Sequence, residues 1–372
     1  MTASKPVLTF RAKAALSLLS LALSLAALEG AARVLRRSAF PYLNLFEADA
    51  RYGVRLHPRD QTRLRSRLGR VTDITTNDLG FRGKSWPPPV SQSVSGILLL
   101  GDSQMFGYGV NEEDATAAKI EQRLGMPVLN ASVPSWGPSE SVLALSDLAP
   151  KYRPRFVLFV ANAANDWFEW AVPNTRRTTA RDGWASGDLA LRSGLSFPGR
   201  EWLLSRSHLV FAARELWEHR AARSIGTGEG SLPAETATQL VHDRERLRKT
   251  SAPHRSPVTS SLLQAREICR TLGCTVVAVA LPLDLQVDPR EWRKYGSSPI
   301  DLSSTESLLE DFIADADEEG IPAINLLAPL REASPGAFLP DDYHLSPKGH
   351  GAVAASISGQ LRQLSRFAEV VR

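Results

Sequence analysis

Short apolar runs recur along the chain and are separated by segments with helical spacing. The runs have the length and apolar content of buried strands, and they lie at residues 97–100, 127–130, 156–160, 275–281 and 323–326. The segments that suit helices lie at residues 115–124, 141–148, 260–272 and 305–316. Strands that alternate with helices in this way predict an α/β fold, in which a parallel sheet carries helices on both faces.

A longer apolar stretch lies near the start of the chain. Its 15 residues, 14–28, are uncharged, follow three basic residues and end at Glu29. This length is typical of a signal-peptide core, whereas a helix that spans a membrane needs about 20 residues. A helix that continued to Leu35 would be long enough. We therefore expect an uncleaved signal anchor, a transmembrane segment at residues 1–40, with a cleaved signal peptide and a soluble amphipathic helix as alternatives.

Charge is distributed unevenly along the chain. The formal net charge is +4, but residues 1–72 hold 13 Lys and Arg against 4 Asp and Glu, which leaves 31 against 36 for the remainder. The arginines that follow the apolar stretch are Arg51, Arg55, Arg59, Arg63, Arg65, Arg67 and Arg70. They either lie along anionic lipid headgroups or belong to a solvated linker. The mildly acidic remainder argues against nucleic acid as a partner.

A proline-rich and serine-rich segment precedes the first predicted strand. It includes Trp86 with three prolines after it and three serines between residues 91 and 95. Such a composition is typical of a linker. We therefore expect a basic juxtamembrane segment and linker at residues 41–95, and one catalytic domain at residues 96–372.

The first candidate for chemistry is Ser103, which follows the apolar run at residues 97–100 directly after Gly101 and Asp102. A serine at this point lies where a strand opens into a helix, and α/β folds place their binding and catalytic groups at that edge of the sheet. A serine hydroxyl becomes a strong nucleophile only when a base takes its proton and a third group orients the base. Ser103 alone is also compatible with an ordinary turn.

Residues 341–347 supply a base and an acid for Ser103. Asp341 stands three residues before His344, and Ser346 and Pro347 predict the start of a helix immediately afterwards. On a short loop this spacing lets Asp341 reach the ring nitrogen of His344 that does not face the serine. We take Asp342 to be one position too close to His344 to serve as the acid.

These segments resemble the GDSL/SGNH hydrolase superfamily. Gly-Asp-Ser is its first block, with the nucleophile at Ser103, and its last block matches Asp341 with His344. The resemblance therefore implies a Ser103, His344 and Asp341 triad, with Asp102 supporting the turn. The segment at residues 76–83 also resembles one that often precedes Gly-Asp-Ser in anchored bacterial members.

The two middle blocks of the superfamily provide an oxyanion hole. The second block normally has a glycine whose main-chain N–H points at the oxyanion, and Ser135 occupies that place here, with Gly137 as an alternative alignment. The third block contributes an asparagine side chain, which matches Asn165, while Asp166 beside it either supports the site or starts a helix. The resemblance implies three donors: the N–H groups of Ser103 and Ser135 and the Asn165 amide.

The resemblance also implies an architecture, an activity and a location. The expected architecture is a three-layer, flavodoxin-like sheet. The expected activity is serine ester hydrolysis of an esterase or lipase type, on an acyl-ester small molecule, a lipid or an acylated glycan, through an acyl-enzyme on Ser103. Two alternatives stay open: an O-acyltransferase or O-acetyltransferase of cell-surface glycans, and a non-catalytic protein that binds carbohydrate or assists assembly. Anchored bacterial relatives place the domain outside the cytoplasm, which implies a single-pass inner-membrane protein that faces the periplasm.

A long interval interrupts the alternation of strands and helices at about residues 168–258. An ordinary connection in such a fold has 2 to 6 residues. The interval leaves the sheet just after Asn165 and contains an apolar, aromatic part at residues 202–217. It therefore forms either a lid or acyl-binding cap over the site, or a peripheral insertion.

Cysteine and histidine give no indication of a metal or cofactor. Cys269 and Cys274 are too few for a zinc site, and they either form a disulfide or remain two separate thiols. The remaining histidines have no ligand spacing, and His350, the rival base, is expected to face solvent. No phosphate loop or dinucleotide fingerprint is present. We therefore expect no cofactor.

Overall fold

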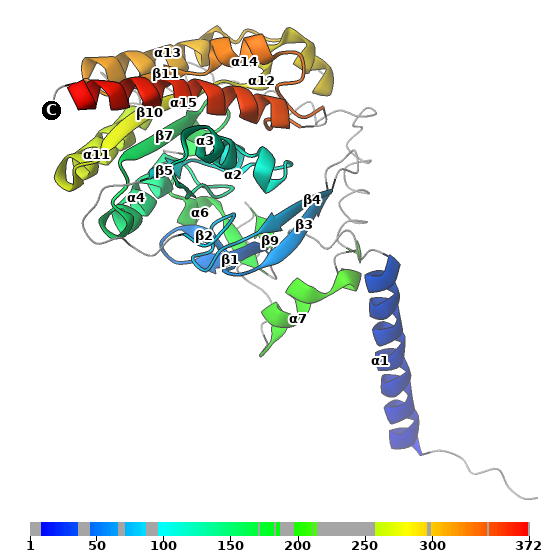
Figure 1. Ribbon diagram of the computed structural model, residues 1–372. Helices are drawn as coiled ribbons and strands as arrows, with labels where there is room; N and C mark the ends of the chain where they lie inside the picture. Colours follow the sequence, from blue (N-terminus) through cyan, green and yellow to red (C-terminus); the bar gives the residue numbers. More distant parts are fainter. Residues whose placement is uncertain are drawn as a thin grey trace, which may run out of the picture.

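The computed structural model describes residues 9–35, 45–65, 71–86, 96–169, 172–181, 184–186, 197–210, 212–213, 257–295, 299–340 and 342–370. At its centre is a parallel sheet of five strands in the order β11-β10-β7-β5-β6 (Figure 1). The strands are β5 (Ile97–Leu100), β6 (Val128–Asn130), β7 (Phe156–Asn162), β10 (Thr275–Leu281) and β11 (Ala323–Asn325). This sheet confirms the predicted α/β fold and its flavodoxin-like strand order.

Helices cover both faces of the sheet. On one face lie α3 (Thr116–Leu124), α14 (Leu327–Ala333) and α15 (Pro347–Val370), and on the other lie α4 (Pro138–Tyr152), α11 (Pro257–Leu272) and α13 (Ser303–Glu318). Successive side chains of β5 enter the two apolar layers alternately, because Ile97 packs in the same cluster as Ile120 of α3 and Leu98 in the same cluster as Leu145 of α4. A strand that is buried on both faces is apolar throughout.

Shorter elements connect these layers or extend them. They are α2 (Ser103–Phe106), α5 (Asp166–Glu169), α6 (Asn174–Arg177), α7 (Arg200–Arg206), α12 (Asp284–Val287), the 3-10 helices Glu112–Asp114 and Pro289–Lys294, and the antiparallel pair β8 (Thr179–Arg181) and β9 (Trp184–Ser186). Much of the 168–258 interval lies outside the described residues, including residues 211 and 214–217 of the apolar, aromatic part.

The segment at residues 41–95 differs from the linker that we expected. Its described part forms two antiparallel hairpins, β1 (Phe46–Asp49) with β2 (Gly53–Leu56) and β3 (Gln61–Arg65) with β4 (Val71–Thr75). Val54, Leu56 and Ile74 are buried in the main core. The domain therefore does not begin near Gly96, because side chains from residues 45–86 complete its core.

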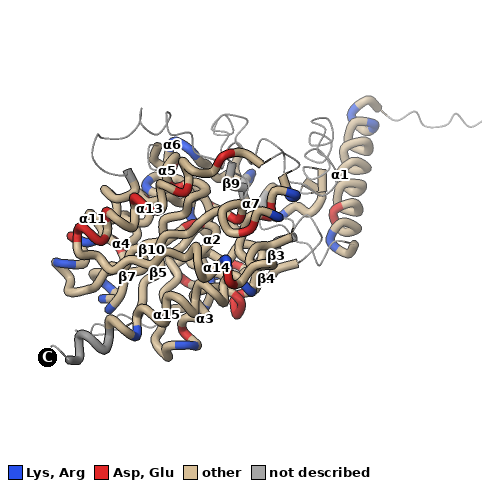
Figure 2. The backbone as a smooth tube through the Cα atoms, turned by 90° about the horizontal axis from the view of Figure 1, so that it is seen from above, with Lys and Arg blue, Asp and Glu red and all other residues tan. Residues whose placement is uncertain are grey.

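Two of the basic residues in this segment are paired with acids. Arg51 contacts Asp147 of α4 at 2.7 Å, and Arg63 contacts Asp73 across the second hairpin at 2.7 Å. Figure 2 shows acidic and basic residues interspersed over the domain. The Arg51 contact attaches the first hairpin to α4, whereas the Arg63 contact lies within the second hairpin.

The N-terminal helix α1 (Phe10–Leu35) stands apart from the sheet layers (Figure 1). It has 26 residues, is long and apolar enough to cross a membrane, and buries none of its most apolar window against the protein. Its leucines are exposed along its length, for example Leu18 and Leu23. An apolar helix with no apolar partner in the described part of the chain requires another environment for that surface.

Candidate active site

Ser103 is the first residue of α2 and follows the carboxyl end of β5. Asp102 caps this short helix, because its Oδ1 accepts a hydrogen bond from the Gln104 N–H at 2.9 Å. Its other oxygen, Oδ2, accepts from the Asn162 amide at 2.7 Å at the end of β7. Asp102 thus joins the turn that carries Ser103 to the neighbouring strand.

His344 faces Ser103 from the loop that precedes α15. The distance from His344 Nε2 to Ser103 Oγ is 2.9 Å. The ring is buried between Tyr108 and Tyr343, whose centroids lie 4.5 and 4.6 Å from it. Ser346 caps the following helix, since its Oγ accepts from the Lys348 N–H at 3.1 Å. The structure therefore places a serine hydroxyl and an imidazole nitrogen at hydrogen-bond distance.

The acid beside His344 is Asp342, not Asp341. Asp342 Oδ1 lies 2.7 Å from His344 Nδ1 and also accepts from the His344 main-chain N–H at 3.3 Å. Asp341 lies outside the described residues, and the position that we expected it to fill is taken by its neighbour. The prediction of Asp341 was wrong because the loop turns tightly at Tyr343, so that a carboxylate two residues before the histidine folds back onto its ring.

Burial and charge shift the pKa of the Asp342 carboxyl in opposite directions. Burial raises the pKa of its carboxyl, but the charge of His344, the hydrogen bond from its ring and the N–H groups of Tyr343 and His344 outweigh burial, so the pKa is lowered. Asp342 therefore remains ionised at neutral pH, as a group that orients and stabilises an imidazolium must.

Gln104 joins the helix that carries Ser103 to the loop that carries His344. Its Nε2 donates to the Tyr343 carbonyl at 3.1 Å, and its Oε1 accepts from the Leu345 N–H at 3.0 Å. One side chain thus bonds to the main chain on both sides of His344. We did not predict this role for Gln104, whose one signal in the sequence is that it directly follows Ser103.

Lys294 also bonds to the loop that carries His344. Its Nζ donates to the Asp342 carbonyl at 2.9 Å, and it also contacts Glu291 and, at 3.5 Å, Asp284. Burial raises the pKa of Asp284 to about 6, although Lys294 and the Tyr295 hydroxyl act against that rise. No motif in the sequence marked these residues, since they come from the short helices that follow β10.

Ser135 has the backbone conformation expected of the glycine that it replaces. Its φ is 75°, in the left-handed region that side chains other than glycine rarely adopt. Among the described residues its N–H has no hydrogen-bond partner, whereas the Gly137 N–H donates to Glu140 at 3.0 Å. Of the two alignments, Ser135 is therefore the one whose amide is available.

Asn165 is held by Glu169. Its Nδ2 donates to Glu169 Oε2 at 2.7 Å, which uses one of the two amide hydrogens and leaves the other available. Burial raises the pKa of Glu169 to about 8, with Arg177 acting against it and the charges of Asp102 and Glu140 adding to it. Asn165 and Ser135 are thus connected, because Arg177 contacts Glu169 at 2.8 Å and donates to the Ser135 carbonyl at 3.2 Å.

Asp166 and His350 are structural. Asp166 begins α5 and accepts from the Asn162 N–H at 2.7 Å, and burial with the nearby charges of Asp102 and Glu169 raises its pKa well above the ordinary value. His350 does not face solvent as we expected. It is fully buried, its Nδ1 lies 2.8 Å from the Thr116 hydroxyl, and burial lowers its pKa to about 3. His350 therefore remains neutral and lies away from Ser103.

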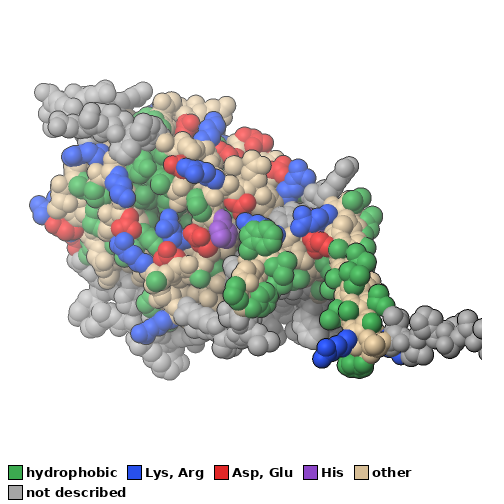
Figure 3. Space-filling view, turned by 90° about the horizontal axis from the view of Figure 1, so that it is seen from below, with side chains coloured by type: hydrophobic (Ala, Val, Ile, Leu, Met, Phe, Trp, Pro, Cys, Tyr) green, Lys and Arg blue, Asp and Glu red, His purple; other side chains and the backbone are tan. Residues whose placement is uncertain are grey.

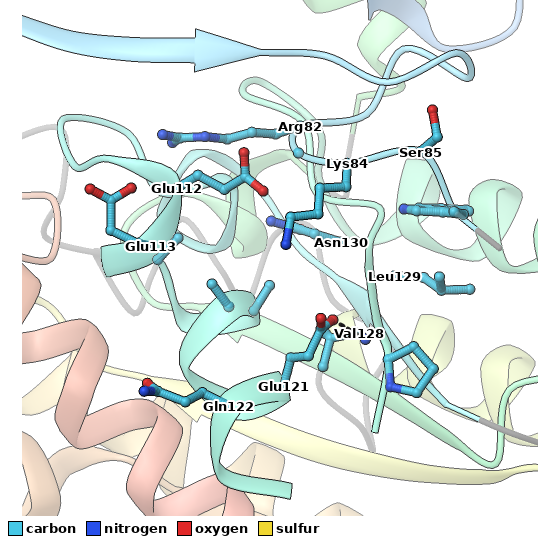
Figure 4. Close-up of a pocket in the computed structure, with 16 residues that line it drawn as sticks. Arg82, Lys84, Ser85, Glu112, Glu113, Glu121, Gln122, Val128, Leu129 and Asn130 are labelled. Atoms are coloured by element: carbon cyan, nitrogen blue, oxygen red, sulfur yellow. Dashed lines mark hydrogen bonds between the residues drawn. The ribbon is translucent and has the colours of Figure 1, made fainter. Parts of the chain in front are cut away.

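The cavity in Figure 4 is separate from these residues. Its volume is about 720 Å³, and its walls come from residues 82–86, from α3 and from β6. The charged side chains in the wall are Arg82, Lys84, Glu112, Glu113 and Glu121. Neither Ser103 nor His344 lines it, and the chain beyond Trp86 on one side of it lies outside the described residues.

A family model described as "SGNH hydrolase-like domain, acetyltransferase AlgX" matches residues 241–371. The matched part contains Asp342 and His344, whereas Ser103 lies before it. This match confirms the predicted resemblance to the SGNH hydrolases over residues 241–371. No curated protein compared with this chain matches it.

Solved structures of a GDSL-like lipase, an esterase and a lipase/acylhydrolase are similar to the chain at low identity. One is a GDSL-like lipase from Bacteroides thetaiotaomicron, at 11% identity and a TM-score of 0.39, covering 74% of this chain and 93% of its own. A psychrotrophic esterase, EstA, from Pseudoalteromonas sp. gives 12% identity, a TM-score of 0.39 and coverages of 73% and 99%. A lipase/acylhydrolase from Enterococcus faecalis gives 13% identity and a TM-score of 0.37, and the match covers 73% of this chain and 96% of its own. At these TM-scores the similarities do not argue for a substrate.

Proposed function

We propose that this SGNH-type protein catalyses acyl transfer through an acyl-enzyme on Ser103. The observation that carries the proposal is the line of contacts from Ser103 Oγ to His344 Nε2 at 2.9 Å and from His344 Nδ1 to Asp342 Oδ1 at 2.7 Å. Nucleophile, base and orienting acid in this order meet the geometric requirement for an activated serine.

The reaction follows from these positions. His344 takes the hydroxyl proton while Ser103 Oγ bonds to the acyl carbon, and the carbonyl oxygen becomes an oxyanion. When the oxyanion collapses, the bond to the leaving alcohol breaks and His344 returns the proton to that alcohol. An acceptor then repeats the sequence on the acyl-enzyme and regenerates the Ser103 hydroxyl. Asp342 holds the ring and stabilises the imidazolium in both halves.

Three groups are proposed as donors to the oxyanion. The N–H groups of Ser103 and Ser135 have no hydrogen-bond partner among the described residues, and the Asn165 amide has one hydrogen beyond the one given to Glu169. Removal of one such donor in an acyl-transfer enzyme costs about 3 kcal/mol in the transition state. The donors supply this stabilisation without reorganising during the reaction.

The first candidate reaction is hydrolysis of an acyl ester, with water as the acceptor. A second candidate is transfer of an acetyl group to a hydroxyl of a cell-surface glycan. The observation that favours it is the match of residues 241–371 to a family whose description includes an acetyltransferase. Both reactions share the acyl-enzyme and differ only in the acceptor.

We further propose that α1 anchors the protein in the inner membrane and that the domain faces the periplasm. The support is the length of α1, its apolar composition and its lack of burial against the domain. Basic residues flank the apolar run on both sides, with Arg11 and Lys13 before it and Arg33 after it, so the orientation proposed here rests on the family resemblance. An anchored enzyme of this kind would act on esters or glycans near the membrane surface.

The test uses the full chain in detergent and a fluorophosphonate, with intact-mass analysis. One adduct is expected on the wild type and on Ser303→Ala, which alters an exposed serine of α13, and none on Ser103→Ala or His344→Ala. No adduct on folded wild-type protein would contradict the proposal and favour the non-catalytic alternative. With p-nitrophenyl acetate and oligosaccharide acceptors, free acetate indicates hydrolysis and acetylated sugar indicates transfer.

A further inference from the structure

The segment that follows α7 is attached to the N-terminal helix. The Glu29 carboxylate of α1 accepts hydrogen bonds from the Ser207 hydroxyl at 2.9 Å, the Leu209 N–H at 3.0 Å and the His208 N–H at 3.1 Å. Arg33 donates to the Arg206 carbonyl at 3.0 Å. Figure 1 shows α7 at the upper part of α1, below the sheet domain. These four contacts fix α7 beside the C-terminal part of α1.

The position of Glu29 in α1 also indicates how deep in a bilayer the contact between α1 and the segment after α7 would lie. It ends the uncharged run at residues 14–28, which as a helix would be about 22 Å long at 1.5 Å per residue. A carboxylate is expensive to place in the hydrocarbon core, so Glu29 is expected at the boundary where α1 leaves the apolar part of the bilayer. The residues that bond to Glu29 must lie at the same boundary.

Three large apolar side chains near this contact are exposed. Trp202 is 64% exposed, Leu203 50% and Phe197 48%. We call them the α7 patch. Figure 3 shows hydrophobic side chains gathered on the lower face of the molecule, next to the column of apolar side chains of α1. Such exposure is unusual for a tryptophan on a surface that meets only water.

The basic side chains around the α7 patch fit an anionic surface. The Arg206 guanidinium lies 5.9 Å from the centre of the Trp202 ring, and Arg33, in the neighbouring turn of α1, is more than half exposed. Tryptophan is favoured at the level of lipid headgroups because its ring is apolar and its N–H is polar. Arginine beside it can contact lipid phosphates while its methylene groups stay on the apolar side.

We propose that the α7 patch is a second membrane contact, in which Trp202, Leu203 and Phe197 enter the headgroup region of the bilayer that α1 spans. The proposal rests on the anchoring role proposed for α1. It assigns this part of the 168–258 interval to the lipid surface, and it gives the catalytic domain two attachments to the membrane.

The test uses the full chain in lipid vesicles and the fluorescence of individual tryptophans. The fluorescence of Trp202 is obtained as the difference in emission between the wild type and Trp202→Phe. Trp86→Phe provides the matched control in the same way, because the Trp86 ring stacks on Phe81 within the domain, with ring centroids 5.0 Å apart. Lipids brominated near the headgroup end of their chains should quench about half or more of the Trp202 contribution and leave that of Trp86 unchanged. Acrylamide in the water phase should affect Trp202 little.

Each other outcome overturns the proposal in a distinguishable way. If the protein floats with the vesicles while acrylamide, and not bromine, quenches Trp202, α1 is an anchor and the α7 patch faces water. If neither quencher reaches Trp202 and its shielding depends on protein density, a second copy covers the patch. If the protein does not float with the vesicles, the anchoring proposal fails and the membrane contact fails with it.

Discussion

Replacing Asp342 with asparagine removes the negative charge next to His344 and leaves the size of the side chain nearly unchanged. The Oδ1 atom lies 2.7 Å from His344 Nδ1, so the two charge centres would be about 4 Å apart when the ring is protonated. At an effective dielectric constant of about 20, the lost attraction is about 4 kcal/mol, or about a 10³-fold lower rate. The introduced amide can also favour the wrong ring tautomer, and the equivalent change in a serine protease costs about 10⁴-fold. We therefore expect Asp342→Asn to slow acylation of Ser103 by about 10³-fold to 10⁴-fold.

Asp341→Asn is the matched control, since it makes the same chemical change one residue earlier. It should keep the rate within about tenfold of the wild type, because Asp342 occupies the only ring nitrogen that does not face Ser103. The assay is the rate of fluorophosphonate labelling, followed by intact mass on full-length protein whose melting temperature is unchanged. If Asp341→Asn abolished labelling and Asp342→Asn did not, the assignment of Asp342 would be refuted.

Three further predictions concern the groups around the triad. Gln104→Met should lower the free energy of unfolding by about 2 to 4 kcal/mol in urea titrations, because the Tyr343 carbonyl and the Leu345 N–H both lose their partner; an unchanged midpoint would speak against this bridge. Glu169→Gln should be neutral near pH 5 and increasingly stabilising as the pH rises to 8. The folded-state pKa of about 8 lies above the ordinary 4.5, so the wild type loses up to about 5 kcal/mol of stability across that window, and a difference that did not vary with pH would contradict the buried-acid assignment. Ser135→Gly should leave labelling within about threefold and change stability by less than about 1 kcal/mol, since the main-chain N–H is kept and the strain at φ 75° is relieved; a large loss of labelling would show that the serine side chain itself takes part.

The sheet could be predicted because helices cover both of its faces, which requires its strands to be continuous apolar runs. Residues 97–100 and 276–281 are buried on both faces, so each run is apolar throughout, and the structure has strands at the predicted limits, 97–100 and 275–281. Ser103 and His344 could be located because each stands beside such an element. By contrast, the hairpins at residues 45–75 were missed. In β4 only alternate positions, Thr72 and Ile74, are buried. We interpreted the arginine-rich segment from its charge and did not recognise this alternation, which is typical of a strand.

The acid of the triad could not be predicted from spacing alone. Whether a carboxylate two or three residues before a histidine reaches its ring depends on the turn between them, and at Tyr343 that turn is fixed from outside by Gln104 and Lys294. Those two residues are distant from the loop in sequence and carry no motif. The contact of Glu169 with Asn165 could not be predicted for the same reason. It depends on where a short helix starts after β7 and on Arg177 from the next helix.

The bridge made by Gln104 has a consequence for when the protein becomes active during its synthesis. Ser103 and His344 are separated by 241 positions, and α15, which packs against α3, is made after the other elements that the structure describes. While the chain is emerging, the nucleophile already exists but has neither its base nor the loop to which Gln104 bonds. Under the proposed mechanism, a chain that is released before His344 is made therefore carries an inert serine. Reactivity of Ser103 would report that the loop of His344 and α15 have docked.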